Sequence, residues 1–88
     1  MDEFSLIVLE DTLQLANEAL PSELISGCVS RIRDYVRAIS ADRTDRNSAQ
    51  SLREVLNQLS DIAHSYRRFL VETRLQGIAR QFDVSDVA

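Results

Sequence analysis

The fold depends on the segment LSDIAHSYRRFLVETRLQGI, residues 59–78, in the last third of the chain. No proline interrupts this segment, and its one glycine is Gly77. Apolar residues recur in it every three or four positions, which is the spacing of a helix with a buried face. Together with the residues before it, the segment predicts one long helix over about 48–81. At 1.5 Å per residue, that helix would extend for about 50 Å.

The long helix carries two apolar rows on different sides. The first row consists of Leu52, Val55, Leu56, Leu59, Ile62, Ala63, Tyr66, Phe69 and Leu70. The second row consists of Val71, Leu75, Ile78 and Phe82, and its centre lies about 130° further round the helix. One straight helix cannot direct both rows at the same neighbour. Either the helix bends or breaks between 71 and 77, or the second row faces another partner, and we therefore expect an oligomer or a bound protein.

Two shorter helices are expected before the long one, over residues 3–20 and 22–41. Two adjacent apolar rows cover roughly 200° of the first helix. The rows are formed by Leu6, Leu9, Leu13, Ala16 and Leu20, and by Phe4, Val8, Leu15 and Ala19. Pro21 ends this helix, because proline lacks an N–H and clashes with the preceding turn. The second helix has a single apolar stripe and begins at Ser22, which is a favourable N-cap.

The 88 residues form one domain, 1–88. Only 2 glycines and 1 proline are available for turns, which favours a few long helices over many short strands. A polar loop at 42–47 precedes the long helix, with Asn47 or Ser48 as its cap. We therefore expect an all-α fold in which two shorter helices pack along one long third helix, a helical hairpin or bundle completed by dimerisation. A break near Gly77 would turn this arrangement into a small bundle.

The charge balance and the single cysteine restrict the class of protein. The net charge is −4 at pH 7 and all ten basic residues are arginine, so nucleic acid is not a favoured partner. One cysteine excludes an internal disulfide and indicates a reducing compartment. Glu10 and Asp11 interrupt the N-terminal apolar run, which argues against a signal peptide and against a membrane partner. We expect a cytoplasmic protein.

The residue types needed for catalysis or metal binding do not cluster in the sequence. One histidine and one cysteine are too few for a zinc or iron site. There is no glycine-rich phosphate loop and no glycine-framed nucleophilic serine. Cys28 lies on the apolar stripe of the second helix, where a free cysteine acts as a small hydrophobic residue. The sequence therefore predicts no enzyme, no cofactor and no metal.

One short motif surrounds the only histidine, His64. The residues that carry it are Asp61, Ile62, Ala63, His64 and Arg67, within DIAHSYRRFL. This stretch resembles the H-box of sensor histidine kinases, and the resemblance implies that His64 accepts a phosphoryl group with Arg67 as a basic neighbour. The acidic residue that follows the histidine in that family is Ser65 here, and Arg68 takes the place of the glycine found in phosphotransfer modules. The alternative is a solvated or salt-bridged surface histidine.

A second short motif lies at the C-terminal end, in LQGIARQFDVSDVA. Its matching residues are Ile78, Ala79, Phe82, Val84 and Ser85. The stretch resembles the first helix and turn of a helix-turn-helix, which implies a fragment of a DNA-binding regulator. Asp83 replaces the usual turn glycine, and no recognition helix follows within the chain. The alternative is an acidic tail over 83–88.

These observations favour a small non-enzymatic protein–protein interaction module. We expect an adaptor or regulator, such as an anti-activator or a secretion-chaperone-like protein, that binds through apolar helix faces. Its partner would be a second copy or a helical segment of another protein. The residues assigned to the interface are Ile7, Leu15, Val71, Leu75, Ile78 and Phe82. The alternatives are phosphotransfer signalling through His64 with Arg67, and DNA binding.

Overall fold

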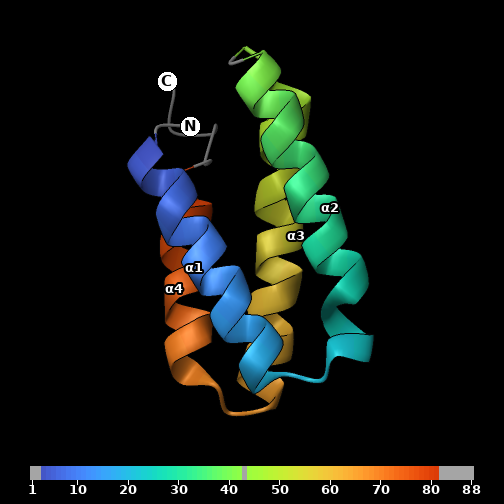
Figure 1. Ribbon diagram of the computed structural model, residues 1–88, viewed down its shortest axis with the longest axis vertical. Coiled ribbons are helices and arrows are strands. Elements are labelled where there is room, and N and C mark those ends of the chain that lie inside the picture. Colours follow the sequence, from blue (N-terminus) through green and yellow to red (C-terminus); the bar gives the residue numbers. More distant parts are fainter. Residues whose placement is uncertain (1–2, 43, 82–88) are drawn as a thin grey trace.

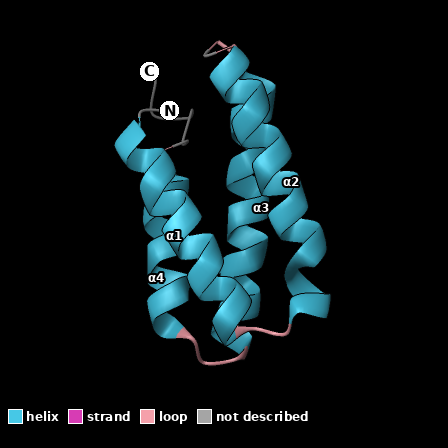
Figure 2. Cartoon of the chain, viewed as in Figure 1, coloured by secondary structure: helices cyan, strands magenta, loops and turns pink. Residues whose placement is uncertain are grey.

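The computed structural model describes residues 3–42 and 44–81, with side chains from residue 6 onward. These residues form four helices, joined by short turns (Figures 1 and 2). The helices are α1 (Glu3–Ala19), α2 (Ser22–Ala41), α3 (Arg46–Ser65) and α4 (Phe69–Arg80). No strand occurs in this described part of the chain, so the predicted all-α class is confirmed. None of the four helices is long and apolar enough to cross a membrane.

The single long helix predicted over 48–81 is wrong. The chain leaves the helix after Ser65 and starts a new one at Phe69, so α3 and α4 form an antiparallel hairpin (Figure 1). This break lies before the predicted interval of 71–77, at a place without glycine or proline. The shift of the apolar rows is real, but a reversal of the chain explains it. Val71, Leu75 and Ile78 of the second row lie on α4, which packs back on α3.

Successive helices run in opposite directions (Figure 1). α3 packs most extensively on α4 and on α2, and α1 packs mainly on α4. Contact between α1 and α2 is sparse. α1 is therefore attached to the bundle mostly through α4, the last helix of the chain.

All four helices contribute apolar side chains to one core. Its largest fully buried members are Leu9, Leu13, Ile25, Ile32, Leu52, Leu56, Leu59, Leu75 and Val71. Cys28 is also buried and free, as its place on the apolar stripe predicted. The one polar side chain among the largest buried residues, Thr12, donates a hydrogen bond from Oγ1 to the Val8 carbonyl at 2.7 Å. This bond satisfies a hydroxyl that would be costly to bury without a partner.

The core includes three residues that the sequence assigned to an interface. Val71, Leu75 and Ile78 are 2%, 0% and 3% exposed within the single chain. They were assigned there because one straight helix could not direct both rows inward, and the hairpin removes that reason. Leu15 is half-buried and Ile7 is 61% exposed.

The remaining interface residue, Phe82, lies outside the described residues, as do Val84 and Ser85 of the helix-turn-helix motif and the tail at 83–88.

Two predicted caps are also wrong. The N-cap of α2 is Pro21 rather than Ser22, and it makes no side-chain capping bond. The N-cap of α3 is Asp45, whose carboxylate accepts hydrogen bonds from the Ser48 N–H at 3.0 Å and the Ser48 hydroxyl at 2.7 Å. Ser48 is thus the donor to the cap and not the cap itself. These bonds from Ser48 hold the pKa of Asp45 below its ordinary value, because they favour the ionised carboxylate.

Candidate functional site

The turn between α3 and α4 contains the least ordinary backbone of the described chain. Arg67 has φ 58°, in the left-handed region, and is the one non-glycine residue there with positive φ among those described. Its N–H donates to the His64 carbonyl at 3.0 Å, and the Arg68 N–H donates to the Ala63 carbonyl at 2.8 Å. This pair of bonds is a Schellman motif, which ends many helices and usually has glycine at the left-handed position. An L-residue there costs roughly 1–2 kcal/mol.

The same turn exposes three large apolar side chains, Tyr66, Phe69 and Leu70, which we call the corner patch. They are 47%, 54% and 60% exposed. The helical spacing predicted that they continue the buried first row, and this prediction is wrong. The spacing applies only while the helix continues, and after Arg67 the chain has turned away from that face.

A groove of about 420 Å³ lies beside the corner patch. It is lined by Leu15 and Ala19 of α1 and by Arg67, Arg68, Phe69, Leu70 and Val71. Its lining includes two arginines and no carboxylate. Arg68 donates from Nε to the Ala19 carbonyl at 3.2 Å, which joins the turn to the last residue of α1. The Arg67 guanidinium makes no hydrogen bond or ion pair within the described residues.

His64 lies in the last turn of α3, facing the first turn of α4. Its Nδ1 is 2.9 Å from Oε2 of Glu72, and the two side chains are 67% and 18% exposed. The Phe69 ring stands edge-on to the imidazole, with 5.9 Å between ring centroids and 65° between planes. The histidine is therefore salt-bridged or hydrogen-bonded at one nitrogen, and exposed.

Glu72 is the residue of this site that the sequence reasoning missed. It follows His64 by eight residues, and on one continuous helix that separation is about 12 Å. Only the reversal at 66–68 brings the two side chains together. Ser65, the next residue in the chain, does not contact the imidazole in this way. Its hydroxyl donates a hydrogen bond to the Asp61 carbonyl at 3.1 Å. The hairpin thus supplies the acidic neighbour that the local motif lacks.

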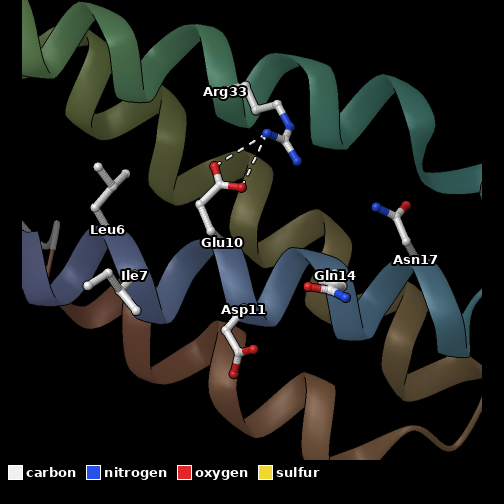
Figure 3. A pocket seen from close by; sticks show the side chains of 7 residues that line it. All are labelled: Leu6, Ile7, Glu10, Asp11, Gln14, Asn17 and Arg33. Carbon is white, nitrogen blue, oxygen red and sulfur yellow. Dashed lines mark hydrogen bonds and ion pairs between the residues drawn. The ribbon is translucent and has the colours of Figure 1, made fainter.

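A second hollow, of about 590 Å³, lies along α1 on the side of α2 (Figure 3). Its lining residues are Leu6, Ile7, Glu10, Asp11, Gln14, Asn17 and Arg33. Glu10 bridges the two helices through an ion pair with Arg33 at 3.2 Å. On the other side of α1, Asp11 pairs with Arg74 of α4 at 3.4 Å. Most of the residues that line this hollow are polar or charged and its charged groups are paired, so it is the weaker candidate for binding.

The two predicted interface residues of the first helix therefore lie in different places. Ile7 lines the hollow beside α2, and Leu15 lines the groove at the corner. Over the residues described, no group of three or more histidine, cysteine, aspartate or glutamate side chains is arranged to hold a metal ion.

Comparison of the chain with family models, with curated proteins and with solved structures found no match. The turn between α3 and α4, with its exposed apolar side chains and its groove, is the main candidate for a functional site.

Proposed function

We propose that this chain is a small non-enzymatic protein–protein interaction module that binds an acidic amphipathic helix of another protein at the corner patch. Such a module would serve as an adaptor or regulator, in the manner of an anti-activator or a secretion chaperone. The observation that carries the proposal is the exposure of Tyr66, Phe69 and Leu70 around one turn. Single exposed apolar residues are normal, but a contiguous patch next to a groove is typical of a binding surface.

The backbone of the turn supports a role for the arginine in binding. Arg67 occupies a left-handed position that glycine would fill at lower cost, and its guanidinium makes no hydrogen bond or ion pair within the described residues. A residue that strains the backbone without stabilising the fold is explained if its side chain serves a partner. Together with Arg68 on a groove lined by no carboxylate, it favours an occupant that carries acidic residues.

The size of the patch favours a single helix over a second copy of the chain. A fully buried aromatic side chain covers about 150–250 Å², so three side chains at about half exposure offer roughly 300 Å². A stable protein–protein interface needs about 800 Å² per partner. The homodimer expected from the sequence was based on surplus apolar surface of the first helix and on the second row of the long helix. Of that second row, Val71, Leu75 and Ile78 are buried within one chain. One helix that inserts two or three apolar side chains fits the available surface.

A peptide titration tests this proposal. The probe is a synthetic amphipathic helix with leucine at positions i, i+3 and i+7 and glutamate on its flanks, added to isotope-labelled full chain and followed by NMR. A peptide with lysine in place of every glutamate is the charge control. The variants are Phe69→Ser and Leu70→Ser, and Ile7→Ser is the matched control, because Ile7 is equally exposed but lines the other hollow.

The expected result is that the acidic peptide shifts resonances of 15–20 and 64–72, and that both corner variants weaken binding at least about tenfold, the equivalent of 1.4 kcal/mol. Ile7→Ser should bind like the unmodified chain, and the lysine peptide should bind weakly or not at all. Equal binding of both peptides, or shifts centred on Ile7, would contradict the proposal. A dimer in light scattering that Leu70→Ser disperses would also contradict it, because the patch would then be occupied by a second copy.

A further inference from the structure

The corner also brings together the groups that a phosphoryl acceptor needs. We propose that His64 accepts a phosphoryl group at Nε2 from an acyl phosphate carried by a docked protein, with Glu72 as the positioning residue that holds Nδ1. The identity of the donor as a docked protein rests on the function proposed above. The reactivity of the histidine does not, because it depends only on the geometry of His64 and Glu72.

Glu72 determines which nitrogen of the imidazole can react. An ionised carboxylate only accepts hydrogen bonds, so the 2.9 Å contact places the proton of a neutral imidazole on Nδ1. The lone pair is then on Nε2, for which the described residues provide no partner. The Phe69 ring lies beside the imidazole in a T-shaped arrangement. A histidine held in one tautomer with its second nitrogen exposed is arranged as a nucleophile or base.

The exposure of the site indicates what kind of electrophile it could meet. The His64 side chain is 67% exposed, and the corner groove is lined by Arg67 and Arg68 but not by the histidine itself. An open position of this kind does not enclose a small substrate or exclude water from it. The site does not itself hold a small donor in place, although an excess of one can reach the exposed imidazole. The physiological donor is therefore a partner that binds through its own contacts, and the corner patch lies immediately beside the histidine.

Arg67 and Arg68 follow His64 by three and four residues, and their positive charge on this corner favours a phosphoryl group over an uncharged acyl group. Guanidinium groups match the geometry of phosphate oxygens and stabilise their charge. Arg67 has no partner, and Arg68 uses only Nε, toward the Ala19 carbonyl, within the described residues. On a continuous helix, Arg68 would stand one turn above His64 and obstruct it. Because α3 ends at Ser65, Arg68 instead turns toward α1 and leaves the imidazole accessible.

The proposed step is balanced without an oxidant, reductant or metal. The Nε2 lone pair attacks phosphorus, the N–P bond forms, and the bond from phosphorus to the acyl oxygen breaks. The carboxylate of the donor leaves with that electron pair. The imidazole becomes a cationic phosphoimidazolium that keeps its Nδ1 proton, and the Glu72 carboxylate stabilises the new positive charge through the same hydrogen bond.

The test uses acetyl phosphate, a small acyl phosphate that needs no docking surface. The full chain is incubated with it, and labelling is followed by phosphorus NMR, which separates the Nε2 and Nδ1 isomers of phosphohistidine. The variants are His64→Gln and Glu72→Gln. Glu54→Gln is the matched control, because Glu54 is an exposed carboxylate on α3 about 15 Å along the helix from His64. Circular dichroism checks that each variant is folded.

The expected product is an acid-labile phosphate on Nε2 of His64, absent in His64→Gln. Glu72→Gln should slow labelling about tenfold or more and yield both isomers, because it removes a charge-assisted hydrogen bond, whereas Glu54→Gln should label at the unmodified rate. No labelling, labelling at Nδ1, or an unchanged rate and isomer in folded Glu72→Gln would overturn the proposal.

Leu70→Ser separates this proposal from the docking proposal. Because acetyl phosphate needs no docking surface, we expect Leu70→Ser to label at the unmodified rate while it loses binding of the acidic peptide. Labelling of an unmodified chain that binds no peptide would refute only the docking surface. Peptide binding without any labelling would refute only the histidine chemistry.

Discussion

Replacing Arg67 by glycine separates the backbone of the corner from its side chain. The left-handed conformation at φ 58° costs an L-residue roughly 1–2 kcal/mol, and glycine removes that cost. Glycine also loses about 0.5–1 kcal/mol more than other residues through its greater freedom in the unfolded chain. The guanidinium makes no hydrogen bond or ion pair within the described residues, so its loss removes neither. The free energy of unfolding of Arg67→Gly should therefore rise by between zero and about 1.5 kcal/mol.

Urea and thermal unfolding of the full chain measure this change, since 1 kcal/mol shifts the Tm of a domain of this size by about 4–8 °C. Arg67→Ala is the matched control, because it keeps a Cβ in the left-handed position and removes only the guanidinium. Its stability should equal that of the unmodified chain, and both variants should bind the acidic peptide more weakly. A loss of stability above about 1 kcal/mol in Arg67→Gly would refute the reasoning, because Arg67 would then hold the fold together.

Three further outcomes follow from the packing and the charges. Leu75→Ala should destabilise the chain by about 2–5 kcal/mol, because the Leu75 side chain is fully buried. Leu70→Ala should destabilise it by less than about 0.5 kcal/mol, because the Leu70 side chain is 60% exposed. Equal losses in chemical unfolding would contradict this difference in burial. The pKa of Asp45 is lowered from 3.8 by its bonds to Ser48, so its contribution to stability is present above about pH 3.8 and is lost as the pH falls through the lower folded value. In acid unfolding curves Asp45→Asn should lack that part of the pH dependence, and an identical curve would show that the cap does not form. A double-mutant cycle on Glu10 and Arg33 should give a coupling of at most about 1 kcal/mol, since the pair is about half exposed; a larger value in thermal unfolding would mean that the pair is the main attachment of α1 to α2.

Helix content and the limits of the first two helices could be predicted because their signals are local. Pro21 ends the first helix, and the predicted spans of 3–20 and 22–41 differ from α1 and α2 by at most one residue. The apolar stripes of these helices predicted the burial of Leu9, Leu13 and Cys28 for the same reason. Residues three and four apart on a helix share a face whatever the rest of the chain does.

The end of α3 could not be predicted from such signals. Arg67 is an ordinary helix former, and neither glycine nor proline stands near the break. What ends the helix there is the burial of Val71, Leu75 and Ile78 against the other helices, a gain that depends on residues far away in the sequence. The shift between the two apolar rows was the one available sign, and it indicates equally well a bend, a break or a second partner.

The sequence by itself determined that this protein is helical and which faces of α1 and α2 are buried. It also determined that two arginines follow the lone histidine closely in the chain. Each of these is a property of residues a few positions apart. Only the tertiary structure decided that Tyr66, Phe69 and Leu70 are exposed, that Val71 and Leu75 are not, and that Glu72 meets His64. The physical reason is the reversal at 66–68, because a single left-handed residue redirects every side chain that follows it, and helical periodicity carries no information across that point.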